Sequence, residues 1–452
     1  MIVMKFGGTS VKNAEAMSSA IEIVRTRKKY SPVVVLSACG GITDKLLELI
    51  NNAPFIQFDE SLKSISEIEN LHLNIIENLI KNKNLKADAT ENIKNLCNDL
   101  KNLIQGITLL RESTPRRADS VLAFGELLST SIFEAACRDN KIDSFFLDAR
   151  KVMKTDNNFN NANVDFELVK KSAEWFILPE LTKGKVVVTQ GFIGSDLSDT
   201  TTTLGRGGSD YSAAVIGSVL NVDEIQIWTD VSGVLSADPR IIPGAKTIPE
   251  MTFNEVLELS YYGAKVLHPD TIKPAIENNI PVKVLNTFQP ENPGTLILGK
   301  SDSNVPSLHS VVMKENCLLC TIDYSNNNNS SDIKNSIVQK LAEQNIIPLF
   351  SSEISHRISI LLDDNPNANE EFIRNFLSEY KQVLKRLTLI CICGNNLDKY
   401  ENGVNSFIEK IVRTTTSYSP HGIIFGLTPA SVLILVPVEK GKSVLEELHK
   451  LI

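Results

Sequence analysis

Short apolar runs without polar alternation recur along the first 300 residues, and each leads into glycine or hydroxyl residues and then a helical pattern. Residues 33–36 are all Val or Leu, and residues 2–6 form a similar run. Strands that are apolar on both sides and alternate with helices are typical of a parallel sheet covered on both faces. The pattern therefore predicts an α/β fold with a parallel-rich sheet sandwiched by helices.

The same periodicities place the remaining elements of this region. Further strands are predicted at residues 185–192, 224–234 and 280–286, and helices at residues 11–30, from 43 onward, 118–139, 211–217 and 252–260. Residues 55–115 differ, because Asn, Lys, Glu, Ile and Leu recur there at helical spacing with few β-branched runs. We interpret this segment as two or more surface helices inserted on the sheet scaffold.

Composition changes near residues 299–304, and shorter elements follow. The expected order is a strand (308–322), a helix (332–344), strands (346–362), a helix (369–381), a strand (387–393), a helix (402–412), two strands (420–437) and a helix (440–449). Such β-rich α+β units suggest two small similar domains. We therefore expect one domain over 1–298 and two small ones over 301–385 and 386–452, whose boundaries can interleave.

Composition and charge narrow the function classes. The chain has 452 residues, of which 42% are hydrophobic and 22% charged, with a net charge of −8. It therefore lacks the overall basic field that attracts nucleic acid or anionic lipid. Seven cysteines, an odd number in apolar contexts, suggest reduced thiols. The sequence begins on a strand-like segment and shows no membrane-spanning apolar run, so we expect a cytoplasmic protein.

Chemically distinctive residues fall just past the carboxyl ends of the predicted strands, where open α/β sheets bind ligands. They are Lys5, Gly7, Gly8, Ser37, Gly40, Gly41, Thr43, Gly191, Thr229, Asp230 and the loop 200–210. Backbone donors, small hydroxyls and isolated cations suit phosphate. The pattern is neither a P-loop nor a dinucleotide fingerprint, because Lys5 precedes its glycines and Asp210 replaces the last glycine of G-x-G-x-x-G.

The loop 200–210 joins a strand to the start of a helix. Free backbone N–H groups and the positive end of a helix dipole meet at such a junction, and glycines let a ligand approach the main chain. Arg206 adds a planar fork suited to carboxylate or phosphate. An ordinary capped loop is the simpler interpretation.

Phosphoryl transfer mainly requires positioning and neutralisation of charge. Lys5, Lys265 and Arg206 can supply the charge, while Asp210 or Asp230 can bind Mg²⁺ or orient a lysine. A carboxylate acceptor would need no general base. On these residues alone a nucleotide-dependent kinase is favoured, and another kind of sheet-edge binding protein remains the alternative.

Six ordered segments resemble aspartate kinase, the enzyme that phosphorylates the side-chain carboxylate of L-aspartate with ATP. They are KFGGTSV at 5–11, FIG at 192–194, TTTTLGRGGSD at 200–210, WTDV at 228–231, DPR at 238–240 and GAKVLHP at 263–269. The resemblance spans residues 1–298. It implies the amino acid kinase fold followed by two ACT domains. It also implies a monofunctional enzyme, because the chain ends where a bifunctional relative would continue into homoserine dehydrogenase.

The resemblance also implies roles for individual residues. The catalytic set is Lys5, Asp210 and Lys265; the aspartate-binding set is Thr43, Glu126, Arg206 and Ser209. The nucleotide-binding set is Gly7, Gly8, Ser37, Thr229, Asp230, Leu235, Arg240, Lys265 and Val266. Leu235 departs from the pattern, because some relatives have a nucleotide-contacting tyrosine at this position.

The implied cofactors and partners are ATP, Mg²⁺ and L-aspartate, with a lysine or threonine effector and a homodimer or larger assembly formed through the ACT-like domains. The Asn-rich segment 326–331 stands where a glycine-containing effector loop is expected. No metal site within the protein is predicted, since Cys317, Cys320, Cys391 and Cys393 lie in apolar strands. The alternative function is a non-catalytic amino-acid sensor with a vestigial kinase site.

Overall fold

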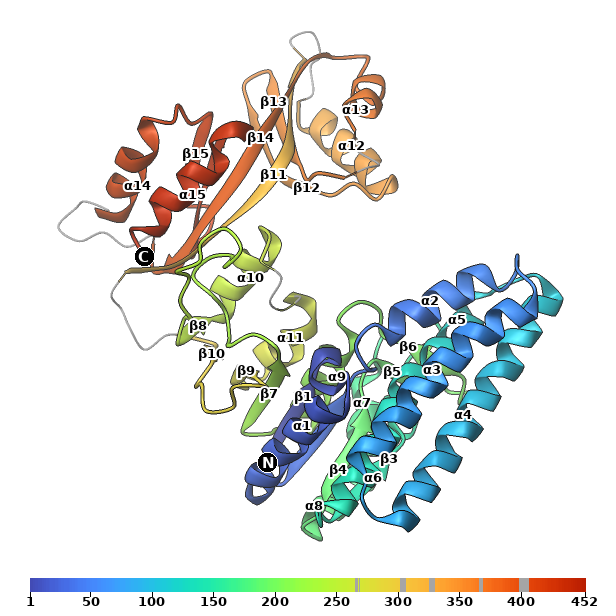
Figure 1. Ribbon diagram of the computed structural model, residues 1–452. Helices are drawn as coiled ribbons and strands as arrows, with labels where there is room; N and C mark the ends of the chain where they lie inside the picture. The colour runs from blue at the N-terminus through green and yellow to red at the C-terminus, as the bar shows by residue number, and fades with distance from the viewer. Residues whose placement is uncertain (265–266, 268, 301–305, 325–329, 366–368, 398–405) are drawn as a thin grey trace. The chain divides into compact units, whose positions relative to one another are not determined.

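The structure, a computed structural model, describes residues 1–264, 267, 269–300, 306–324, 330–365, 369–397 and 406–452. It divides into two compact units (Figure 1). The first comprises residues 1–234, 249–253 and 267–300, and the second comprises residues 235–248, 254–266 and 301–452. Two segments between residues 235 and 266 thus belong to the unit that the end of the chain forms.

An eight-stranded sheet forms the centre of the first unit. Its order is β3 (Ser144–Leu147), β4 (Val186–Gln190), β2 (Pro32–Leu36), β1 (Ile2–Phe6), β7 (Glu224–Thr229), β9 (Val282–Asn286), β10 (Thr295–Leu298) and β8 (Glu250–Thr252). The strands from β3 to β9 are parallel, whereas β10 runs antiparallel to β9. The carboxyl ends of β2, β1, β7 and β9 therefore lie at one edge, and β1 and β2 are buried at every position.

Helices cover both faces of this sheet. One face packs against α1 (Ala14–Arg27) and α6 (Phe124–Asp139), and the other against α9 (Gly208–Leu220), which in turn contacts α7 (Phe166–Phe176) and α11 (Pro269–Glu277). The unit also contains α2 (Ile42–Asn52), α5 (Pro115–Leu122) and α8 (Leu178–Thr182), together with the helix pair described below. A short hairpin of β5 (Ile193–Ser195) and β6 (Thr201–Thr203) leads into α9. The predicted α/β class with a parallel-rich sheet is confirmed.

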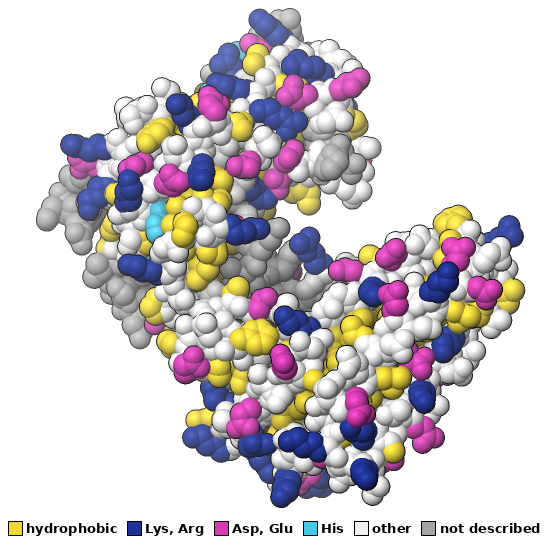
Figure 2. All heavy atoms as spheres, viewed as in Figure 1, with side chains coloured by type: hydrophobic (Ala, Val, Ile, Leu, Met, Phe, Trp, Pro, Cys, Tyr) yellow, Lys and Arg dark blue, Asp and Glu magenta, His cyan; other side chains and the backbone are white. Residues whose placement is uncertain are grey.

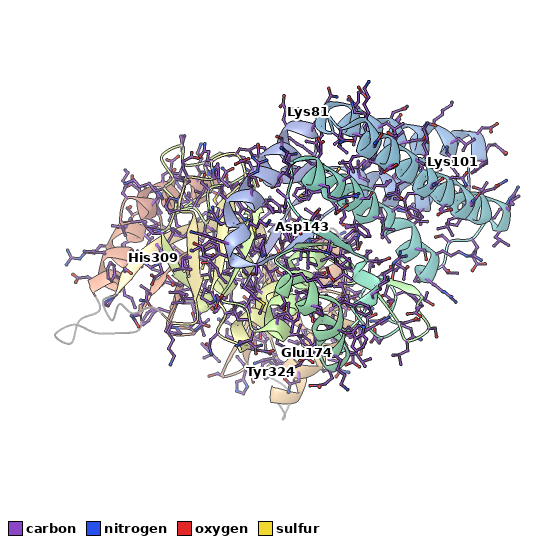
Figure 3. The ribbon with its side chains drawn as sticks, turned by 90° about the horizontal axis from the view of Figure 1, so that it is seen from below. Lys81, Lys101, Asp143, Glu174, His309 and Tyr324 are labelled. Atoms are coloured by element: carbon purple, nitrogen blue, oxygen red, sulfur yellow. The ribbon has the colours of Figure 1, made fainter. Side chains whose placement is uncertain are left out.

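The segment 55–115 forms two long helices, α3 (Phe58–Leu79) and α4 (Lys83–Leu110), which pack on each other. Figure 3 labels Lys81 at their connection and Lys101 on α4. Lys101 Nζ lies 3.2 Å from a Glu69 carboxylate oxygen, and Asp139 accepts hydrogen bonds from the backbone N–H groups of residues 81 and 82. The helix pair is therefore anchored to the end of α6, and its C-terminal end leads directly into α5.

The second unit contains a six-stranded antiparallel sheet. Its order is β12 (Pro348–Ile354), β13 (Arg357–Leu362), β11 (Ser307–Asp323), β14 (Lys381–Asn395), β16 (Ser431–Pro437) and β15 (Gly422–Phe425). Its helices are α10 (Phe253–Tyr261), α12 (Ser330–Glu343), α13 (Glu370–Phe376), α14 (Ser406–Thr416) and α15 (Gly441–His449). The long strands β11 and β14 contribute to two separate hydrophobic cores. Antiparallel strands backed by helices fit the predicted α+β class.

The predicted helix over 369–381 is partly wrong. The helix α13 ends at Phe376, and β14 begins at Lys381, six residues earlier than the strand predicted at 387. In β14 exposed and half-buried side chains alternate from Lys381 to Arg386, because only one face of the strand is covered there. That alternation contains too few apolar residues to separate strand from helix without knowledge of the partner strand.

Charged side chains of both signs are interspersed over the described surface in view (Figure 2). Among the described residues, the helical stretch Pro115–Asp139 is long and apolar enough to cross a membrane. Its most apolar 18-residue window is 83% buried inside the protein. Burial of this kind is expected of a core helix, and α6 indeed lies between the sheet and the α3–α4 pair.

Candidate active site

A pocket of about 750 Å³ opens at the carboxyl edge of the first unit's sheet. It collects side chains from β1, from the β2–α2 loop, from α5 and α6, and from the loop before α9. Eight of the predicted site residues line it: Lys5, Gly8, Ser37, Thr43, Glu126, Arg206, Ser209 and Asp210. The topology thus brings together residues that are up to about 200 positions apart in the sequence.

Lys5 and Asp210 form an ion pair inside this pocket. Lys5 Nζ lies 2.7 Å from Asp210 Oδ1, and the two side chains are 11% and 18% exposed. Asp210 stands in the first turn of α9 and not at the cap, since the N-cap is Gly207. A carboxylate in that turn is stabilised by the helix dipole, and it holds the ammonium group of Lys5 in one place.

The loop before α9 presents Arg206 between two glycines with positive φ, Gly205 and Gly207. Arg206 is exposed and makes no hydrogen bond or ion pair with any residue that the structure describes. Its guanidinium is therefore available to an incoming anion. Ser209, in the first turn of α9, lines the same pocket.

Glu126 is a buried carboxylate with one unsatisfied oxygen. Its side chain is 3% exposed; Oε1 accepts a hydrogen bond of 3.1 Å from the backbone N–H of Ala38, and Oε2 has no hydrogen-bond partner among the described residues. Burial raises the pKa of Glu126 to about 8, against the opposing effects of the Ala38 hydrogen bond and the Lys5 charge. A Cβ on Gly125 would lie only 2.8 Å from Ala38 Cβ, so glycine permits the close approach that makes this bond.

The predicted nucleotide-binding residues are distributed more widely. Gly7 donates its backbone N–H to Trp228 O, which fixes the end of β1 against the end of β7, where Thr229 and Asp230 follow. Thr229 and Asp230 do not line the 750 Å³ pocket. Thr229 Oγ1 donates a hydrogen bond of 3.2 Å to Asp230 Oδ1, which lies on the surface.

The other predicted nucleotide residues lie elsewhere in the chain. Leu235 and Arg240 belong to the second unit. Arg240 Nε donates a 3.0 Å hydrogen bond to Asp238 Oδ1, and this pairing raises the pKa of Arg240 further. Lys265, Val266 and the neighbouring His268 lie outside the described residues.

Several pocket residues were not predicted from the sequence. Phe192 lines the pocket with a left-handed backbone (φ 67°), which is rare for a bulky side chain and marks a constrained position. Asn160, Ser113 and Thr114 also line it. Phe192 belongs to the FIG segment at 192–194 that contributes to the family resemblance, although no role was predicted for it, and the other three come from segments without a motif.

Comparison with known proteins agrees with this geometry. Residues 1–286 match the amino acid kinase family. The chain is 32% identical to lysine-sensitive aspartokinase 3 of Escherichia coli (strain K12), over 99% of this chain and 98% of that protein.

Solved structures are similar along the whole chain. The crystal structure of E. coli aspartokinase III in complex with aspartate and ADP has a TM-score of 0.81 at 31% identity, and covers 100% of this chain and 99% of that one. The complex of the same enzyme with lysine and aspartate has a TM-score of 0.83 at 32% identity, with the same coverage. The chain therefore belongs to the aspartokinases of the amino acid kinase family.

Proposed function

We propose that the chain catalyses the ATP-dependent phosphorylation of the side-chain carboxylate of L-aspartate to 4-phospho-L-aspartate, the first step toward lysine, threonine and methionine. The observation that carries this proposal is the unpaired Oε2 of Glu126, buried in the pocket that also holds Arg206 and the Lys5–Asp210 pair. A site that binds a free α-amino acid requires an anion for the α-ammonium and a cation for the α-carboxylate. A site that also transfers an anionic phosphoryl group requires a second cation.

On this proposal, the acceptor is held at its two α-substituents. Arg206 receives the α-carboxylate through its planar fork, and Glu126 accepts hydrogen bonds from the α-ammonium. Thr43 and Ser209, which line the same pocket, complete the acceptor site. The side-chain carboxylate of the substrate is then left to face Lys5. It is already ionised near neutral pH, so no residue has to remove a proton from it.

In the transfer step a side-chain oxygen of aspartate forms a bond to the γ-phosphorus of ATP, while the bond from that phosphorus to the bridging oxygen breaks and ADP leaves. Lys5 stabilises the charge on the transferred group, and Asp210 orients Lys5. Gly7, Gly8 and Ser37 offer backbone approach to the phosphates. Lys265, which lies outside the described residues, is proposed as the second cation.

We also propose nucleotide-binding roles for Thr229 and Asp230 in the first unit, for Leu235 and Arg240 in the second, and for Val266, which lies outside the described residues. Mg²⁺ binds few protein ligands when it accompanies a nucleotide, usually one or two carboxylates together with phosphate oxygens. The surface carboxylate of Asp230 fits that requirement, whereas Asp210 is engaged by Lys5. When bound, Mg²⁺ would neutralise phosphate charge.

A substrate panel with ATP and Mg²⁺ tests the proposed function. Release of ADP should depend on L-aspartate and be absent with glutamate, N-acetylglutamate or UMP, and the product should react with hydroxylamine as an acyl phosphate does. Turnover of one of the other acceptors without aspartate would assign the chain to a different kinase of the family. Tight amino-acid binding without any phosphoryl transfer would support the alternative of a non-catalytic sensor.

We infer that the second unit is regulatory and consists of two ACT-like domains at about 301–385 and 386–452. The strand β11 contributes to both domains, one end to each. The two hydrophobic cores of this unit support the division. Residues 308 and 311 of β11 belong to the core that includes the C-terminal helix α15, and residues 318, 320 and 322 belong to the other core. We also propose a homodimer or larger assembly through these domains and a cytoplasmic location.

Lysine is the effector that we expect, because the similar E. coli enzyme is lysine-sensitive. Millimolar L-lysine should lower the rate at subsaturating aspartate severalfold, while L-threonine at the same concentration should leave the rate within experimental error. The assay is steady-state ADP release across a titration of each amino acid. Equal responses to both amino acids, or none to lysine, would contradict this assignment. Residues 326–329 of the segment 326–331, where the effector loop is expected, lie outside the described residues.

A further inference from the structure

Asp119 is a fully buried carboxylate that does not line the pocket and has no part in the mechanism above. It projects from α5, and its carboxylate accepts hydrogen bonds from two segments that are distant in sequence. Its Oδ1 and Oδ2 lie 3.1 and 3.0 Å from the backbone N of Asn160. Thr203 donates its backbone N–H to Oδ2 (2.9 Å) and its hydroxyl to Oδ1 (2.7 Å). Each carboxylate oxygen thus accepts hydrogen bonds from both segments.

These two segments hold the loop that carries Arg206. Thr203 is the last residue of β6, two positions before Gly205. The turn containing Asn160 is joined to the same strand, because Ala162 N–H donates to Thr203 O (2.9 Å). It also abuts Gly205, where an added Cβ would lie 2.7 Å from Asn161 Oδ1. The start of the Arg206 loop is therefore enclosed by groups that Asp119 fixes.

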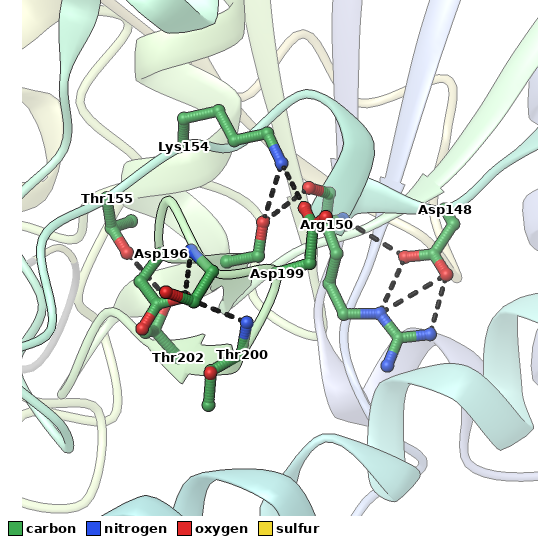
Figure 4. A network of polar contacts seen from close by, with 10 residues as sticks. Asp148, Arg150, Lys154, Thr155, Asp196, Asp199, Thr200 and Thr202 are labelled. Carbon is green, nitrogen blue, oxygen red and sulfur yellow. Dashed lines mark hydrogen bonds and ion pairs between the residues drawn. The ribbon is translucent and has the colours of Figure 1, made fainter.

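The other two threonines of β6, Thr201 and Thr202, are held by a separate polar network, part of which Figure 4 shows. Thr202 Oγ1 lies 2.7 Å from Thr155 Oγ1, and Arg150, which is paired with Asp148, donates to Thr201 Oγ1 at 3.2 Å. The hydroxyl of each threonine of β6 thus has a hydrogen-bond partner of its own. Only Thr203, the one next to the Arg206 loop, is bound to a buried carboxylate.

From this arrangement we infer that Asp119 is a positioning residue, which sets the location of Arg206 for the α-carboxylate of the amino-acid substrate. The inference rests on the proposed function. Asp119 is not a catalytic residue, because its carboxylate oxygens already accept hydrogen bonds from Asn160 and Thr203. Arg206 has no partner of its own in the described structure, so its position depends on the loop that bears it. A displacement of about 1 Å in such a binding group is enough to reduce catalysis substantially.

The test compares Asp119→Ala with Asp119→Asn. Removal of the carboxylate leaves the N–H groups of Asn160 and Thr203 without their acceptor, so in Asp119→Ala the KM for aspartate should rise about 10- to 100-fold while the KM for ATP stays within about twofold. In Asp119→Asn the amide oxygen accepts from both N–H groups and the amide N–H₂ donates to Thr203 Oγ1. The KM for aspartate should then stay within about threefold of the wild-type value.

A double-mutant cycle separates positioning from general stability. If Asp119 acts through Arg206, Asp119→Ala should change kcat/KM for aspartate less than about threefold in an Arg206→Ala background. Glu134→Ala is the matched control. Glu134 is a buried carboxylate on α6, bound to Ser144 and Arg138, and its loss should lower the melting temperature without changing either KM.

An Asp119→Ala enzyme with a lowered melting temperature but an unchanged KM for aspartate would overturn the inference, as would additive effects of the two substitutions. If Asp119→Ala does not fold, Thr203→Val removes the hydroxyl contact alone and should raise the KM for aspartate severalfold; an unchanged KM there also overturns it. Failure of the proposed function would look different from failure of this inference, because the wild-type chain would then show no turnover of aspartate.

Discussion

Lys5→Ala should lower kcat by about 10³-fold with little change in the KM for aspartate. The ammonium of Lys5 is held by Asp210 at 2.7 Å in a largely buried site, so its charge is directed at the pocket with little rearrangement. Removal of one such preorganised donor from a transition state costs about 3 to 4 kcal/mol. Because the phosphoryl group gains its charge distribution in the transition state, the loss should appear in kcat. Steady-state ADP release and a single-turnover measurement check it.

Lys283→Ala is the matched control for this substitution. Lys283 is another lysine of the same sheet, it lies within β9, and its Nζ is 2.6 Å from a carboxylate oxygen of Glu224. Loss of this half-exposed pair should cost only a fraction of a kcal/mol and leave kcat unchanged. If Lys5→Ala retained more than about a tenth of the wild-type kcat, Lys5 would have no electrostatic role in the transfer step.

Lys5, Glu126 and Arg206 show which parts of the site can be derived from sequence. The rule that ligands bind past the carboxyl ends of parallel strands predicts that Lys5 and the loop of Arg206 lie at one edge of the sheet, because the buried apolar runs indicate parallel strands. Glu126 was assigned by resemblance alone. A helical glutamate is usually a surface residue, and nothing in the local sequence reveals that its helix packs against Ala38.

Asp119 and the α5–α6 boundary illustrate what the sequence does not contain. The helix predicted over 118–139 is divided at Ala123 into α5 and α6, which gives Asp119 and Glu126 different surroundings. The partners of Asp119 are 41 and 84 residues away and follow neither helical nor strand periodicity. Contacts between separate elements are set by the packing of the whole unit, so a pattern within one element does not predict them.

Glu126→Gln should lower kcat/KM for aspartate by about 10²-fold or more, mainly through KM. Glutamine has nearly the same shape and its amide oxygen still accepts the Ala38 N–H, but it carries no charge for the α-ammonium. Loss of one partner from a buried charge pair costs about 2 to 5 kcal/mol. Glu134→Gln, on the same helix but away from the pocket, should leave kcat/KM unchanged. An equally small effect of both substitutions would exclude Glu126 from the aspartate site.

The pKa of Glu126 adds a pH signature to this prediction. Since burial raises that pKa to about 8 in the free protein, the carboxylate needed by the ammonium is scarce below that pH. The KM for aspartate should therefore rise by up to about tenfold for each pH unit between pH 8 and pH 6, and this slope should disappear in Glu126→Gln. Initial rates over that range in both proteins, normalised to the wild type at pH 9, measure it.

Stability should respond in the opposite sense to activity. Because the folded-state pKa of Glu126 lies above its ordinary value of 4.5, the folded protein binds more protons than the unfolded chain between those two pH values, and this group destabilises the fold as pH rises through that window. Above pH 8 the cost is at most about 5 kcal/mol, and glutamine does not incur it. The melting temperature of Glu126→Gln should therefore exceed that of the wild type at pH 9, and the difference should shrink toward pH 5. Aspartate at a concentration that saturates only the wild type should narrow the gap at pH 9, because the carboxylate that is costly in the free protein is the one that we propose binds the α-ammonium.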